Sequence, residues 1–411
     1  MPFQTHRLPN GLQLIGEVLP TARSVSLGFF VVTGSRDETP QECGVSHFLE
    51  HMVFKGTPRR TAFDVNRDFD RIGANYNAYT SEENTVYYAS VLPEYFPKAL
   101  DILADILHPS LRTEDFDTEK KVILEEIKMY DDQPGSVAWD NAKKIYYRGH
   151  TLGNSILGTH DTITALTAEQ MRAYYERRYT PNNMVFSIAG NIDWDDVVEK
   201  VARATHGWNP GSVERGGVVQ AHGPGGIHAV ANEKLNQQHV LCLSPGNPAD
   251  DLLRYTAGTL AVAIGDDSGS RLHWELVDTG KVESASCGID SSVGSGLFAV
   301  TFSGEPANAP ENLRTVQRVL VDVQENGLTV NELQQAKNKI ASRVVRASER
   351  PSGRMRAIAG GWIYTGEYSD PDVDLARFDA VTTGTIRDYL AQYPITATTT
   401  IGYGPMSNLA E

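Results

Sequence analysis

The sequence predicts an α+β fold of two tandem homologous domains, each a mainly antiparallel sheet covered by helices. Three observations support this prediction: the order of the expected helices and strands, a glycine- and proline-rich stretch near the middle, and a repeated pattern on either side of it. The 411 residues suit two domains of about 200 residues better than one. With 40% hydrophobic and 22% charged residues, each half can bury an ordinary core.

In the first half, expected strands and helices do not alternate as repeated strand–helix–strand units. The near-continuous apolar run at 24–33 indicates a central strand, and Thr39-Pro40-Gln41-Glu42 resembles a helix start. The expected strands are 11–17, 24–33, 75–81, 85–92 and 184–189, with a hairpin turn at 81–84. The expected helices are about 40–55, 62–72, 94–107, 113–132, 136–147, 167–178 and 193–205.

The segment 209–226, NPGSVERGGVVQAHGPGG, has the composition of a linker between a first domain (1–208) and a second domain (227–411). It lacks the strand-to-helix context of a phosphate-binding loop. The second half begins again with strands. We expect strands at 227–233, 238–244, 282–289 and 297–303, and helices at 248–264, 269–278, 309–325 and 330–349.

An internal repeat supports this division. A threonine, then an apolar residue, an arginine and a tyrosine occur with the same spacing at 167–174 and 382–389. Each pattern is followed by a short strand that ends near a glycine, at Gly190 and Gly404. Because the two copies lie about half a chain apart, they predict tandem copies of one domain.

Charge and cysteine content exclude several classes of protein. A net charge of -15 argues against nucleic acid or an anionic membrane surface as a partner. Cys43, Cys242 and Cys287 are spaced for neither a disulfide framework nor a zinc ribbon. Residues 1–16 lack the pattern of a secretory leader and no run could span a bilayer, so the cytoplasm is the simplest compartment.

The string His47-Phe48-Leu49-Glu50-His51 is the strongest chemical signal in the chain. Two histidines four residues apart on a helix share one face, so both imidazoles can reach one metal ion with a carboxylate nearby. A lone histidine is more often part of a core. An ionisable triplet is costly to bury without compensation, so this string favours a metal site.

A third ligand is expected from the helix at 113–132. Glu125 lies on a stripe of alternating charge that faces solvent, whereas Glu126 projects from a largely apolar stripe where a carboxylate needs a partner. On periodicity alone, Glu126 at the edge of the stripe reaching water remains an alternative. Glu119, two turns earlier, could accept a hydrogen bond from the second ring nitrogen of a ligand histidine.

The H-x-x-E-H order is the signature of the inverzincins. With it, segments 44–57, 75–94, 119–132, 150–159 and 178–193 resemble the M16 peptidases, the family of insulin-degrading enzyme, pitrilysin and the mitochondrial processing peptidase. This resemblance spans nearly the whole first half. It implies one Zn²⁺ per chain held by His47, His51 and Glu126, with Glu50 as general base and Glu119 supporting the ligands.

The resemblance also implies how substrate binds. In that family the halves face each other like a clamshell around a peptide-sized chamber, and short or unfolded peptides are hydrolysed inside. Substrate is expected to add as an extended strand to residues 75–80, with Asn77-Ala78 near the scissile bond and Thr80 also among the substrate-binding residues. A non-catalytic scaffold and a peptide-binding subunit remain the alternatives to a peptidase.

The second half departs from the family pattern. Active family members of the single-chain or self-sufficient type carry an arginine and a tyrosine seven residues apart, after an Arg-Leu pair, and the arginine and tyrosine contact substrate across the chamber. Arg271-Leu272 is present, but the two positions hold Val277 and Ser284, or Glu283 with a one-residue deletion. We therefore expect a homologous partner subunit that supplies this pair, so that the chain forms half of a clamshell heterodimer. A homodimer remains possible.

Overall fold

The computed structural model describes residues 3–213, 215 and 220–409. The chain forms two compact units that each combine one sheet with covering helices, which confirms the predicted α+β class. The first unit comprises 1–128, 154–216 and 346–370, and the second comprises 129–153, 217–345 and 371–411. The predicted linker at 209–226 lies partly outside the described residues.

The first unit is built on a six-stranded sheet with strand order β1-β2-β6-β3-β5-β4. Its strands are β1 (Phe3–Arg7), β2 (Gln13–Val18), β3 (Val25–Val31), β4 (Asn75–Thr80), β5 (Thr85–Val91) and β6 (Met184–Gly190). Its helices are α1 (Val45–Val53), α2 (Ala62–Arg71), α3 (Phe96–Ile106), most of α4 (Thr113–Asp131), α6 (His160–Ala165), α7 (Ala168–Arg178), α8 (Trp194–Ala204) and α12 (Pro351–Thr365).

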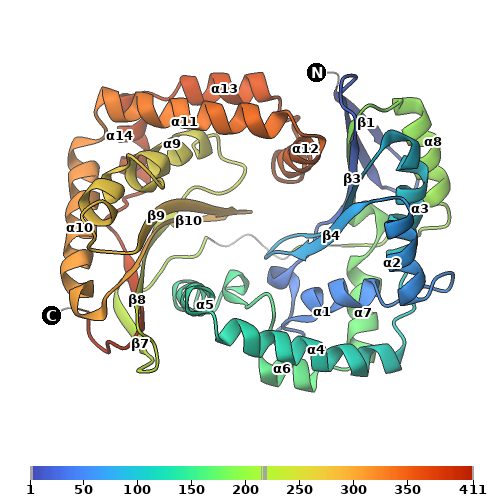
Figure 1. Cartoon of the computed structure of the whole chain (residues 1–411), viewed down its shortest axis with the longest axis horizontal. Coiled ribbons are helices and arrows are strands. Elements are labelled where there is room, and N and C mark those ends of the chain that lie inside the picture. The colour runs from blue at the N-terminus through green and yellow to red at the C-terminus, as the bar shows by residue number, and fades with distance from the viewer. Residues whose placement is uncertain (1–2, 214, 216–219, 410–411) are drawn as a thin grey trace. The chain divides into compact units, whose positions relative to one another are not determined.

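Both faces of this sheet are covered, as the central strand β3 demonstrates. All seven of its residues are buried, as its apolar run predicts. Its odd-numbered residues, such as Phe29, belong to the core that includes residues of α3 and α8, whereas Phe30 packs with Met355 and Ile358 of α12. Figure 1 shows α3 and α8 on one side of this sheet and α12 on the other. Alternation along one strand therefore anchors helices on opposite faces of the sheet.

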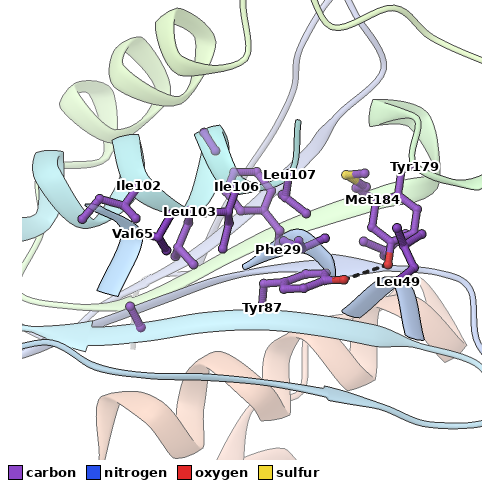
Figure 2. Close-up of a cluster of buried hydrophobic side chains, with 14 of the residues drawn as sticks. Phe29, Leu49, Val65, Tyr87, Ile102, Leu103, Ile106, Leu107, Tyr179 and Met184 are labelled. Atoms are coloured by element: carbon purple, nitrogen blue, oxygen red, sulfur yellow. Dashed lines mark hydrogen bonds between the residues drawn. The ribbon is translucent and has the colours of Figure 1, made fainter. Parts of the chain in front are cut away.

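The core under α3 includes polar atoms that are fully satisfied. Figure 2 shows Phe29 and Tyr87 beneath Ile106 of α3, with Leu49 of α1 nearby. The hydroxyls of Tyr87 and Tyr179 hydrogen-bond to each other at 2.8 Å. Both rings are buried, and this pairing avoids the cost of an unsatisfied hydroxyl in an apolar core.

The second unit is built on a five-stranded sheet with strand order β7-β11-β8-β10-β9. Its strands are β7 (Gly226–Ala231), β8 (Gln238–Gly246), β9 (Ser284–Ser292), β10 (Ser295–Gly304) and β11 (Thr399–Gly404). Its helices are α5 (Pro134–Tyr146), α9 (Arg254–Gly265), α10 (Ala309–Asn326), α11 (Val330–Ser348), α13 (Pro371–Asp379) and α14 (Thr383–Gln392), with a π-helical turn at His273–Val277. Among the described helices, none has both the length and the apolar character needed to cross a membrane.

The two sheets have the same topology. Order β2-β6-β3-β5-β4 corresponds strand for strand to β7-β11-β8-β10-β9, and the first neighbouring pair is parallel in both sheets. The predicted repeat falls on equivalent elements, because Thr167 and Thr382 cap α7 and α14. The strands that follow end at Gly190 (φ 147°) and Gly404 (φ 156°), a conformation that favours glycine. The shared strand order therefore confirms the predicted tandem duplication.

Each sheet also receives a helix from the other half of the sequence. The helix α5, from the first half, packs on β8 and β11, whereas α12, from the second half, packs on β2, β3 and β6. A sheet buried on one side still has an apolar second face to cover. The compact units therefore differ from the contiguous ranges 1–208 and 227–411 expected from sequence.

Candidate metal centre

The helix that carries both histidines is shorter than expected. The predicted start at residue 40 is wrong, because α1 begins at Val45 after Gly44, whose φ is 93°. The Thr39 hydroxyl donates to the Glu42 carboxylate at 3.0 Å, so these residues close a local turn. A capping pattern was present, but it stabilises this turn and no helix follows it directly.

A buried carboxylate instead caps α1 from outside the helix. The two oxygens of Glu38 accept the amide hydrogens of Gly44 and Ser46, both at 2.7 Å. The Ser46 hydroxyl hydrogen-bonds with that of Tyr174 at 2.7 Å, which ties α1 to α7. Burial raises the pKa of Glu38 to about 8, so the start of α1 is held by these two hydrogen bonds, which satisfy free amides at the helix N-terminus.

The structure brings His47, His51 and Glu126 together, as predicted. One ligand atom from each of the three lies within 4.8 Å of the others. The Glu126 Oε2 lies 3.5 Å from His51 Nε2 and 3.8 Å from His47 Nε2. These distances are too long for strong hydrogen bonds. They approach the roughly 3.4 Å expected between neighbouring ligand atoms around a tetrahedral zinc ion, so the residues fit a metal.

A second carboxylate orients one of the histidines. The Nδ1 of His51 lies 2.9 Å from Glu119 Oε1, and Lys55 Nζ lies 2.6 Å from Glu119 Oε2. An Nδ1–H donated to Glu119 leaves Nε2 with a free lone pair on the side of Glu126. Glu119 thus lies within hydrogen-bonding distance of the second ring nitrogen of His51, as expected, and Lys55 pairs with the other oxygen of Glu119.

The two histidines have opposite electrostatic environments. Burial, with a contribution from nearby His51, lowers the pKa of His47 to about 3, so His47 is neutral near pH 7. Burial acts to lower the pKa of His51 as well. The hydrogen bond with Glu119 and the charges of Glu126 and Glu50 outweigh burial, so the pKa of His51 is raised. A neutral imidazole is the form that binds metal, and His47 is held in it.

Glu50 lies beside this cluster, and a hydrogen bond holds its carboxylate in place. Its Oε2 accepts a hydrogen bond from the Thr80 hydroxyl at 2.8 Å. Burial raises the pKa of Glu50, while the Thr80 hydrogen bond acts in the opposite direction. A carboxylate with a raised pKa beside a metal-binding triplet has the properties of a general base.

The predicted substrate strand is the edge of the first sheet. Among the described strands, β4 stands at the end of the order and pairs with β5 alone. Along β4, Asn77 and Tyr79 are exposed, whereas Ala78 and Thr80 are half-buried on the other face. The Ala78 amide donates to the Asn77 side-chain oxygen at 2.8 Å. An edge strand with exposed polar groups can accept another extended strand.

The apolar stripe around Glu126 differs from the expectation. Val122 and Met129, one turn before and after Glu126, are 46% and 54% exposed, whereas Ile123 is fully buried. The stripe therefore lies at the boundary of the core. Glu126 is partly exposed and meets both histidines there.

Two contacts at this centre were missed by sequence analysis. Lys55 lies four residues after His51, and that spacing is a signal that could have indicated a contact on the same side. No local signal reveals that Thr80 binds Glu50, because the contact joins residues 30 positions apart. Of the two substituted family positions, Val277 ends the π-helical turn and Ser284 begins β9.

Two models of one peptidase family together match most of the chain. Residues 15–160 match the family described as Insulinase (Peptidase family M16), and residues 165–340 match the family described as Peptidase M16 inactive domain. An uncharacterized zinc protease of Streptomyces coelicolor is 34% identical, with 92% of this chain and 84% of the relative covered. An uncharacterized zinc protease of Bacillus subtilis is also 34% identical, with 90% and 91% covered.

Solved structures share the fold. A protease from Helicobacter pylori superposes with a TM-score of 0.89 at 19% identity, covering 98% of this chain and 99% of that one. A putative M16-like peptidase from Alicyclobacillus acidocaldarius gives a TM-score of 0.84 at 24% identity, with 98% of both chains covered. From the family matches and the relatives above 30% identity, this chain belongs to peptidase family M16.

Proposed function

We propose that the protein is a zinc-dependent peptidase that hydrolyses short or unfolded peptides. The observation that carries this proposal is the convergence of His47, His51 and Glu126 next to Glu50. Relatives named zinc proteases support the choice of metal and reaction. Two imidazoles and a carboxylate also form a donor set that suits zinc and leaves room for a water ligand.

In this proposal His47, His51 and Glu126 hold the metal, and Glu119 keeps His51 in the required tautomer. Bound zinc would lower the pKa of a water molecule and polarise the scissile carbonyl. Glu50 would accept a proton from the water molecule whose oxygen attacks the carbonyl carbon. It then delivers the proton to the leaving nitrogen as the C–N bond breaks. No covalent bond to the protein forms.

Substrate would bind to the open edge of β4 as an additional strand. Main-chain hydrogen bonds to residues around Asn77 and Ala78 would hold the peptide with little dependence on its sequence. The Asn77 side chain, which accepts from the Ala78 amide, must then give way to a peptide carbonyl. Only extended or unfolded chains can pair in this way, and a closed chamber would add a size limit.

We also propose that a homologous partner subunit completes the enzyme. Val277 and Ser284 cannot make the polar contacts of an arginine and a tyrosine. A partner with those side chains would contribute them to substrate binding in a heterodimer.

The test is zinc content and cleavage of quenched fluorogenic peptides by the whole protein, alone and with its copurifying partner. Glu50→Gln should retain about one zinc per chain and lose cleavage by at least ~100-fold, because the base is removed while the ligands remain. Glu126→Gln should lose zinc as well.

The neighbouring Glu125→Gln provides a matched control. Glu125 is exposed and pairs only with Lys128 among the contacts described for it, so zinc and activity should stay unchanged. Wild-type protein that binds zinc but cuts no peptide under either condition would overturn the proposal and favour a binding role.

A further inference from the structure

We propose that Thr80 is a positioning residue that fixes the carboxylate of Glu50, and that it does not contact substrate. This inference rests on the proposed function, and it reassigns a residue that the sequence alone places among the substrate contacts. The main observation that supports this proposal is the 2.8 Å hydrogen bond from Thr80 Oγ1 to Glu50 Oε2.

The geometry commits the one hydrogen of the Thr80 hydroxyl to a single acceptor. A threonine hydroxyl has a single hydrogen to donate, and Glu50 receives it. Among the contacts described for Glu50, this is its one hydrogen bond. Thr80 lies on the half-buried face of β4, shared with Ala78, whereas the exposed face carries Asn77 and Tyr79. A peptide that pairs with the edge of β4 has no need of this hydroxyl.

The turn that follows Thr80 is clamped by buried charge. Glu83, in the turn between β4 and β5, pairs with Arg36 at 2.7 Å, and both side chains are at most 4% exposed. Arg215 donates to the Glu83 carbonyl at 2.8 Å and forms a two-pronged pair with Asp37. Buried charge pairs of this kind resist rearrangement, so the turn after β4 is fixed to Arg36 and Asp37, and the next residue, Glu38, caps α1.

This arrangement assigns different tasks to the two oxygens of Glu50. Oε2 is held by Thr80 throughout, which leaves Oε1 to accept the proton from the attacking water. Without the hydroxyl, the carboxylate could rotate and present neither oxygen correctly. A loss of this kind lowers the rate of the chemical step, because small displacements of a catalytic group are costly. Substrate affinity should not change.

The first experiment compares Thr80→Val with Thr80→Ser in the whole protein, with its partner where activity requires one. The valine variant keeps the shape of the side chain and removes the donor. We expect kcat to fall by roughly 10- to 100-fold with KM within about 2-fold. The serine variant should recover most of kcat, and zinc content and unfolding temperature should match wild type.

The control is Thr118→Val, the same change at an exposed position of α4 whose hydroxyl bonds only to the Glu114 carbonyl among its described contacts. It should leave kcat unchanged. A rise in KM at constant kcat in Thr80→Val would overturn the proposal and return Thr80 to the substrate contacts.

A second readout does not depend on turnover. In the Glu50→Gln background, adding Thr80→Val should leave the dissociation constant of a fluorescent peptide unchanged, because Thr80 touches no substrate. Crystal structures should show Glu50 in one rotamer in wild type and Thr80→Ser, and in several in Thr80→Val. A single unchanged rotamer in Thr80→Val would refute the proposal. Absence of cleavage by wild type would instead count against the proposed function.

Discussion

Glu119 shows how one side chain organises a metal-binding group at the residue scale. Burial acts to raise the pKa of Glu119, but hydrogen bonds with His51 and Lys55 outweigh burial, so the net pKa is lowered. The carboxylate is therefore ionised near neutral pH. An ionised acceptor at Nδ1 keeps the hydrogen there and directs the Nε2 lone pair toward Glu126.

Glu119→Gln should lower zinc affinity by about 10- to 100-fold, because a neutral amide holds the His51 tautomer less firmly. Lys55→Met, which leaves the His51 contact in place, should have a smaller effect. Competition with a chromogenic chelator measures both, and Glu125→Gln serves as the control. Equal affinity in wild type and Glu119→Gln would show that the hydrogen bond does not influence the metal.

Helical spacing was sufficient to predict that His47 and His51 share one face of a helix, and the family resemblance added Glu126 as the residue that meets them. Contacts that depend on how a strand lies against a helix could not be predicted in this way. The hydrogen bond from Thr80 to Glu50 needs both the register of β4 and its packing on α1. Neither is encoded in a local pattern.

At the scale of elements, α12 illustrates packing that sequence periodicity did not reveal. Its Arg354 donates to the Glu17 carboxylate of β2 at 2.7 Å, and the two side chains are 4% and 0% exposed. Tyr368, just after α12, donates to the other oxygen of Glu17 at 3.0 Å. A buried ion pair between a late helix and an early strand fixes where α12 sits on the sheet.

Arg354→Met should destabilise the first unit by about 3–5 kcal/mol, because Glu17 is left charged and buried without its cation. The paired variant Arg354→Met with Glu17→Leu should recover most of that loss. Urea unfolding followed by fluorescence measures both. A single variant as stable as wild type would mean that the pair does not hold α12.

Asp266 connects two elements in the second unit. This residue follows α9 and receives hydrogen bonds from Lys339, at 2.8 Å, and Arg343 of α11. Burial acts to raise the pKa of Asp266, but these bonds outweigh it and the net pKa is lowered. A carboxyl with a lowered folded pKa adds stability above its ordinary value, near 4, and that stability is lost as pH falls through the folded value.

Asp266→Asn should therefore lower the unfolding temperature at pH 7 by roughly 2–4 °C, the effect of about 1 kcal/mol for partly screened pairs. The difference from wild type should shrink as the pH drops below 4. Calorimetry across pH 3 to 7 measures it. A difference that grows on acidification would give the wrong sign for this mechanism.

Most elements followed from local patterns. The hairpin of β4 and β5 and the caps of α7 and α14 were predictable because turn and capping residues act over a few positions. The start of α1 was not, because its cap comes from Glu38, six residues before Gly44. The pattern from Thr39 to Glu42 resembles a helix start, although it closes a local turn, and it therefore led to a start that is too early.

At the scale of the whole molecule, duplication and exchange explain the architecture together. Two copies of one strand order account for both sheets, and each sheet is completed by a helix from the other half of the chain. Neither half of the sequence thus contains all of its own core. Exchanged helices join distant segments, which a reading of contiguous ranges cannot detect.

The exchange predicts that a fragment ending before the second half cannot fold normally. Residues 1–208 alone lack α12, so the β3 face that carries Phe30 would be exposed. We expect this fragment to aggregate or to bind a hydrophobic dye, and a separately supplied segment 346–370 to reduce that binding. A monomeric, cooperatively unfolding fragment 1–208 would contradict this interpretation.

The proposed zinc site and substrate strand are tested together by a crystal structure of Glu50→Gln with zinc and a peptide, recorded on both sides of the zinc absorption edge. We expect one anomalous peak bounded by His47, His51 and Glu126, with the peptide paired along β4. A peak elsewhere, or no peak under zinc-replete conditions, would contradict the proposed site.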